Sequence, residues 1–210
     1  MYMEAVTVKQ MIYHTLKERI LDGQYAFGEK LNIDAICKDL SVSNSPVREA
    51  LALLVKDHLV VMRPNTGAHV VELTPRIYNE LTDAVNTMLL GAYEICCRRG
   101  KKQTLLLQLE QRYEDLLASL SSGEKARIYG ILYFDRCFVT ATENDMFLSM
   151  FDGQLDFLYL AYVYNHCDRS IDWEHNAQRS RALIEAVREG KSELVKDILC
   201  ERSNSHIAGD

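Results

Sequence analysis

One short β-hairpin in an otherwise helical chain is the feature that most constrains the fold. Two β-branched runs, residues 59–63 (LVVMR) and 68–72 (AHVVE), flank the four residues 64–67 (PNTG), which is a pattern typical of a hairpin. The 210 residues include only 3 Pro and 10 Gly, and this scarcity favours long helices over a turn-rich β protein. We therefore expect a mainly α protein with one small β-hairpin.

Three helical segments precede the hairpin. Apolar residues recur at helical spacing over residues 8–22, and two shorter helices follow, one ending near Leu40 and one beginning near Ser45-Pro46. Either Asn32 or Asp34 can cap the second segment. Three helices followed by a hairpin within about 65 residues predict a winged helix-turn-helix, a DNA-binding unit.

The dipeptide Thr74-Pro75 marks the predicted domain boundary. It separates a winged helix-turn-helix domain at 1–74 from an all-helical domain at 75–210. Short Gly, Ser and Asn punctuation divides the second domain into helices, which pack as an antiparallel bundle. The six helices are expected at 76–99, 103–120, 124–142, 145–165, 173–189 and 192–206.

The N-terminal pattern resembles the winged helix of GntR-type bacterial transcription regulators, on residues 16–31, 43–51 and 59–71. The helical remainder is similar to the ligand-binding (FCD) domain of the FadR-like subgroup, on ATEN (141–144) and on residues 175–193. Six helices instead of seven point to its VanR-like variant. The resemblance implies a homodimeric regulator, such as a repressor, that binds a double-stranded DNA operator and responds to a small-molecule effector.

The resemblance also indicates which residues face DNA. The N-terminal residues of a recognition helix reach base edges in the major groove, and a wing reaches the neighbouring minor groove. Arg48 could instead pair with Glu49 or Glu29, and Gly67 could be only a turn residue. Because Asp34 and Asn44 stand where relatives often carry Arg, a different operator or weaker binding is expected. The predicted DNA-binding residues are Ser43, Asn44, Ser45, Val47, Arg48, Arg63, Asn65, Thr66 and Gly67.

The charge balance excludes binding of nucleic acid by bulk positive charge. The chain carries 24 Lys and Arg against 30 Asp and Glu, a net charge of −6. Residues 1–74 hold eight basic and nine acidic side chains, so no broad basic face is expected there. A local DNA-binding surface with few phosphate contacts remains compatible with these numbers.

The resemblance also implies a bundle that binds a divalent metal through an Asp, a His four residues later and two further His. Those positions hold Ile131, Asp135, Ser180 and Arg202, so we predict no metal and no cofactor. An Asp135–Arg202 ion pair beside Ser180 could be structural or could anchor an anionic effector. Tyr133, one of several aromatic residues of the central helices, could edge the same cavity. The family's effector-binding Arg is replaced by Val85 or Asn86.

Three alternatives remain open. The first is a DNA-binding dimer with a degenerate pocket and no ligand control. The second, an enzyme, is disfavoured because no catalytic constellation or phosphate-binding loop is visible. The third is a thiol sensor that uses Cys96, Cys97 or Cys137. The chain shows no secretion signal and no apolar run long enough to span a membrane, so a cytoplasmic protein with reduced cysteines is expected.

Overall fold

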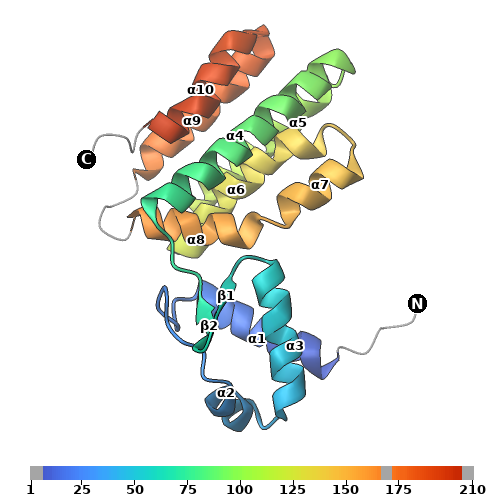
Figure 1. Ribbon diagram of the computed structural model, residues 1–210. Helices are drawn as coiled ribbons and strands as arrows, with labels where there is room; N and C mark the ends of the chain where they lie inside the picture. The colour runs from blue at the N-terminus through green and yellow to red at the C-terminus, as the bar shows by residue number, and fades with distance from the viewer. Residues whose placement is uncertain (1–6, 167–171, 205–210) are drawn as a thin grey trace. The chain divides into compact units, whose positions relative to one another are not determined.

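The computed structural model describes residues 7–166 and 172–204, with His166 and residues 201–204 described by their backbone only (Figure 1). Contacts between Cα atoms divide the chain after Leu73 into two compact units. Over the described residues, the fold is mainly helical with one two-stranded antiparallel sheet, so the predicted fold class is confirmed.

The N-terminal unit is a three-helix winged helix-turn-helix, as the hairpin predicts. The strands pair with Val60 opposite Val70 and Arg63 opposite Gly67, so the wing is a short ribbon with a tight tip. Its elements are α1 (Val8–Leu21), α2 (Ile33–Leu40), α3 (Asn44–Lys56), β1 (Val60–Arg63) and β2 (Gly67–Val70).

Local capping and a small apolar core explain why this unit forms. Thr7 and Gln10 make a reciprocal capping box at the start of α1, and Asn32, not Asp34, caps α2 by accepting two backbone N–H bonds. The helices bury Leu16, Ile36 and Leu54 between them. Such burial of aliphatic side chains is the main source of stability in a small domain.

The C-terminal unit is all-helical over its described residues. In this bundle α5 packs against α6 and α9, and α4 packs against α6 and α10 (Figure 1). No helix in the described part of the chain is long and apolar enough to cross a membrane. The helices are α4 (Pro75–Arg98), α5 (Lys102–Ser119), α6 (Glu124–Thr140), α7 (Asp145–Asp152), α8 (Leu155–His166), α9 (Trp173–Glu189) and α10 (Ser192–Asn204).

The single helix predicted over 145–165 is two helices, so the described part of this unit has seven helical segments instead of six. At the end of α7, Gln154 N–H bonds to the Phe151 carbonyl, three residues back, so the last turn is tighter than the helix before it. Gly153 sits where a Cβ would lie 3.3 Å from the Ser149 carbonyl oxygen, a tight approach for a side chain. The break between α7 and α8 is thus a local turn that apolar periodicity alone does not reveal.

Candidate nucleic-acid interface

The N-terminus of α3 presents an exposed polar edge. Ser43 precedes the helix in an extended conformation and makes no side-chain cap, so its hydroxyl is not bonded to the first backbone N–H groups of the helix. Asn44, Ser45 and Arg48 are also exposed. Uncapped N–H groups and exposed hydroxyls at a helix N-terminus are suited to phosphate oxygens.

Arg48 is oriented by its own helix. Its Nε donates a hydrogen bond to Oδ1 of Asn44, one turn earlier, while Ser45 Oγ donates to Oε1 of Glu49 at 3.3 Å. The structure therefore places Arg48 against Asn44, not in the expected alternative pairing with Glu49 or Glu29. A guanidinium carries five N–H donors, so most of its donors are left for a base or a phosphate.

Val47 corrects one predicted contact. Its side chain is 0 % exposed and belongs to the core, together with Ala50 and Leu51 of the same helix. Positions 47, 50, 51 and 54 form the buried stripe of α3, since residues three and four apart share a helix face. Val47 therefore positions the recognition helix and cannot itself touch DNA in this conformation.

The wing places three of its four predicted residues on the exposed tip or edge. Arg63, Asn65 and Thr66 are exposed, and Gly67 is half-buried. Asn65 and Gly67 have φ of 61° and 90°, left-handed values that favour these two residue types in a tight turn. Gly67 is thus required by the turn, whatever else it contacts.

Acidic partners reduce the positive charge of this unit. Nη2 of Arg63 lies 2.7 Å from Oε2 of Glu72 at the base of the wing, and Arg19 pairs with Asp39 at the same distance. Arg63 must release or share Glu72 to bind a phosphate. These two ion pairs are in keeping with the near balance of basic and acidic residues in this unit.

The residues predicted to bind an effector separate into two groups. Ile131 and Asp135, one turn apart on α6, are 2 % and 1 % exposed, and Ser180 of α9 is 2 % exposed and donates to the Asn176 carbonyl. Tyr133 was expected to edge the same cavity, but it is 42 % exposed and lies on the other side of α6. The side chain of Arg202 lies outside the described residues, so the Asp135–Arg202 pair stays a prediction.

The interior beside the first bundle helix has little room. Val85 and Asn86, which replace the family's effector-binding Arg, face a cavity of about 20 Å³ between α4 and α8. That volume holds about one water molecule. The described residues contain no group of three or more His, Cys, Asp or Glu arranged to hold a metal ion. The predicted absence of a metal stays a prediction.

Two of the three candidate sensor thiols are buried. Burial raises the pKa of Cys96 to about 11 and that of Cys137 to about 12. A thiol must ionise to react with an oxidant, so both are poor sensors at neutral pH. Only Cys97 of the three is exposed. The thiol-sensor alternative is therefore disfavoured for Cys96 and Cys137.

The N-terminal unit thus has the winged helix-turn-helix fold, with an exposed polar edge at the start of α3. Residues 8–70 match the family described as bacterial regulatory proteins, gntR family. The chain is also 26% identical over 190 residues to an uncharacterized HTH-type transcriptional regulator, YdhC of Bacillus subtilis (strain 168). This alignment covers 88% of the chain and 82% of the relative.

Solved structures share the fold. A putative GntR regulator from Rhodococcus sp. RHA1 superposes with a TM-score of 0.67 at 18% identity, over 94% of each chain. E. coli McbR/YncC superposes with a TM-score of 0.66 at 20% identity, over 97% of each chain. The match over residues 8–70 and the likeness to YdhC make the N-terminal unit similar to the winged helix of GntR-type transcription regulators, and the solved structures show that the fold is shared.

Proposed function

We propose that this chain is a homodimeric regulator that reads a short palindromic operator through α3 and the wing, and that residues 75–210 form its FadR-like domain for dimerisation and effector binding. The observation that carries the DNA-binding part is the division of α3 into two faces. Ser43, Asn44, Ser45 and Arg48 are exposed, while Val47 and its buried neighbours fix the helix in the core.

Dimerisation follows from the small number of cationic side chains on this interface. Among the predicted DNA-binding residues of one unit, the cationic side chains are Arg48 and the Glu72-paired Arg63, and this small charge does not favour tight binding by a single copy. Two copies related by a two-fold axis present two recognition helices about 34–36 Å apart, which matches one turn of DNA. Affinity would then depend on both half-sites.

A regulator without ligand control is the second candidate. The cavity of about 20 Å³ beside Val85 and Asn86 favours it, since a drug-sized ligand needs roughly 300 Å³ or more. The first candidate places its effector beside Asp135 and Ser180, which are polar residues buried inside the bundle. A thermal-shift screen with acyl-CoA esters, fatty acids, sugar acids and dicarboxylates separates the two.

The DNA-binding proposal is tested with the full chain and operators selected from random DNA. Arg48→Ala should weaken binding by about 10- to 100-fold, because a bidentate contact to a base contributes roughly 1–3 kcal/mol. Arg181→Ala is the matched control, since Arg181 lies on α9 and pairs with Glu185 at the surface. If the chain selects no sequence, or if both variants bind like the original, the proposal is wrong.

Salt dependence tests the small number of phosphate contacts. With about three phosphates contacted per subunit, the logarithm of affinity should fall with that of salt at a slope of roughly −5 per dimer. A slope beyond about −10 would contradict the view that this interface has few cationic contacts.

A further inference from the structure

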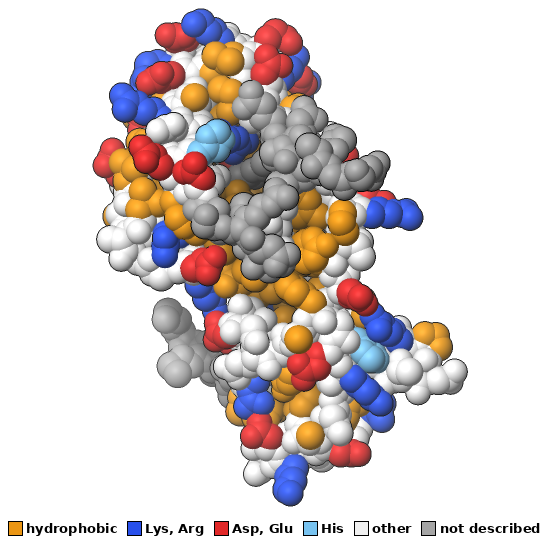
Figure 2. Space-filling model, turned by 90° about the vertical axis from the view of Figure 1, so that its left-hand side faces the viewer, with side chains coloured by type: hydrophobic (Ala, Val, Ile, Leu, Met, Phe, Trp, Pro, Cys, Tyr) orange, Lys and Arg blue, Asp and Glu red, His pale blue; other side chains and the backbone are white. Residues whose placement is uncertain are grey.

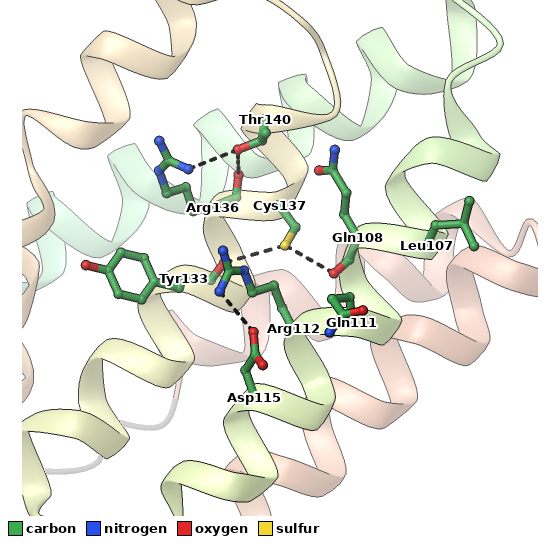
Figure 3. A pocket seen from close by; sticks show the side chains of 9 residues that line it. All are labelled: Leu107, Gln108, Gln111, Arg112, Asp115, Tyr133, Arg136, Cys137 and Thr140. Carbon is green, nitrogen blue, oxygen red and sulfur yellow. Dashed lines mark hydrogen bonds and ion pairs between the residues drawn. The ribbon is translucent and has the colours of Figure 1, made fainter.

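A groove on the outer side of α5 and α6 has the size and the polar lining of a small-molecule site. Its volume is about 590 Å³, within the range of ligand pockets. It lies on the Tyr133 side of α6, away from the buried Ile131 and Asp135. Figure 3 shows Arg112 and Cys137 in its middle, with Tyr133 on one side and Leu107 on the other.

Side-chain sizes explain why the groove is open. Helices α5 and α6 are closely packed at Gly130 of α6. A Cβ on this residue would lie 2.8 Å from Ser119 Oγ and 3.2 Å from Leu116 Cδ1, both on α5. Further along α6, the short side chains of Cys137 and Thr140 line the groove. Short side chains between two helices leave space that longer neighbours do not fill.

Arg112 supplies an available cationic group. Within the described residues its hydrogen-bonded partner is Asp115 on the same helix, through Nη1 and Oδ2 at 2.9 Å. Both side chains are about half exposed, and an exposed pair of this kind contributes little. The guanidinium therefore has donors left for a carboxylate or a phosphate, which it binds well because of its planar fork.

Arg136 does not compete for that role. It is held by Asp152 of α7 through two hydrogen bonds, and its remaining edge makes a long 3.5 Å contact with Thr140 Oγ1. It contributes positive charge to the rim of the groove while staying in place.

The other polar groups match a hydroxylated molecule. Gln108 and Gln111 bring side-chain amides, and Thr140 brings a hydroxyl. Oε1 of Gln108 is buried and makes no hydrogen bond to the described residues, so an unused acceptor lies on a residue that lines the groove. Tyr133 offers an exposed ring that can cover the apolar face of a small polyol.

We propose that the groove between α5 and α6 binds a small hydroxylated organic anion, with its carboxylate or phosphate on Arg112 and its hydroxyls on Gln108, Gln111 and Thr140. This deepens the proposed function, since such a ligand would be the effector, and its regulatory meaning rests on that function. The site differs from the bundle interior, where Asp135 and Ser180 lie.

Calorimetric titration of the full chain with three matched probes tests the proposal. Ribitol, ribonate and ribitol 5-phosphate share a five-carbon polyol and differ in their anionic group. At least one anion should bind about tenfold or more tightly than ribitol, and the one that does so tells a carboxylate site from a phosphate site. Equal binding of all three, or no binding of either anion, would overturn it.

Variants locate the site. Arg112→Gln should weaken anion binding about tenfold, whereas Asp115→Asn should strengthen it by removing the competing carboxylate. Arg181→Gln, which removes an exposed pair on α9, should leave binding unchanged. Equal effects of Arg112→Gln and Arg181→Gln would overturn the assignment to this groove. These titrations contain no DNA, so they test the groove separately from the proposed function. If an anion binds in the groove but the chain recognises no operator, the proposed function is wrong and the binding site is still supported.

Discussion

Arg136 of α6 holds Asp152 at the end of α7 through two parallel hydrogen bonds, Nε to Oδ1 at 2.6 Å and Nη2 to Oδ2 at 2.8 Å. The carboxylate lies at a helix C-terminus, where negative charge is unfavourable, and the guanidinium offsets that cost. Asp152 also raises the pKa of Arg136, chiefly through these hydrogen bonds, so the guanidinium stays charged at any ordinary pH.

This pair should stabilise the junction of α6 and α7. Arg136→Met is expected to lower the free energy of unfolding by about 1 kcal/mol, because both side chains are partly exposed and the pair is worth more than a simple surface contact but less than a buried one. Arg181→Met should change it by less than about 0.5 kcal/mol. Urea unfolding monitored by circular dichroism measures both, and equal effects would show that Arg136 is merely another surface charge.

Two helical glycines should respond oppositely to the same change. A Cβ on Gly91 of α4 would meet no heavy atom within 4 Å, so Gly91→Ala should stabilise by about 0.5–1 kcal/mol through helix propensity. Gly130→Ala forces Ser119 and Leu116 to move, and overpacking of this kind costs about 1–3 kcal/mol. Thermal unfolding of both variants is the measurement, and a stabilisation at Gly130 as large as that at Gly91 would contradict the close approach of α5 and α6.

Tyr13 should make the N-terminal unit sensitive to alkaline pH. Burial and a hydrogen bond from its hydroxyl to Oδ2 of Asp57 raise the pKa of Tyr13 from 10.0 to about 12. Between these values the unfolded chain loses the tyrosine proton and the folded chain keeps it, so the free energy of unfolding falls as pH rises from about 10 to 12. Below pH 10 the contribution is fully present.

The Tyr13→Phe variant isolates this effect. The buried thiols Cys96 and Cys137 also have raised pKa values, so they too lower the free energy of unfolding as the pH rises. The useful quantity is therefore the difference in the free energy of unfolding between the original protein and Tyr13→Phe. That difference should change across pH 10 to 12 and be constant between pH 7 and 9. A constant difference up to pH 12 would contradict the Tyr13–Asp57 bond.

Thiol reactivity should separate the cysteines by burial. Iodoacetamide at pH 8 should modify Cys97 and Cys200, which are exposed, long before Cys96 and Cys137, whose burial raises their pKa. Mass spectrometry of tryptic peptides gives the order. If Cys137 were modified as fast as Cys97 in the folded protein, the result would contradict the burial of Cys137 between α5 and α6. It would also support the thiol-sensor alternative for this residue.

Much of the N-terminal unit can be predicted from the sequence, because its signals are local. The turn at 64–67, the cap at Asn32 and the apolar spacing along α3 each act within a few residues. The resemblance marks the whole start of α3 as DNA-binding and does not show which side of the helix is buried. The prediction that Val47 contacts DNA is therefore wrong. The stripe that Val47 forms with Ala50, Leu51 and Leu54 is the signal that could have shown its burial.

The helical unit shows where local signals end. Helices α4, α5, α6 and α9 lie close to their expected bounds, but apolar periodicity predicts a single helix where Gly153 separates α7 from α8. Residue type alone suggests an interior place for Tyr133, although it lies two positions from both Ile131 and Asp135 and thus on another face. No motif marks the groove, since its residues come from two helices of ordinary composition.

The sequence by itself determined the winged helix, the change to an all-helical unit after Thr74 and the lack of a broad basic face, because periodicity, caps, turn residues and charge counts are properties of neighbouring residues. Only the tertiary structure decided that Val47 is core while Arg48 is exposed, that Arg136 is bound to Asp152, and that Arg112 lies in an open groove. These depend on contacts between distant segments, and packing selects among faces that local pattern leaves equivalent.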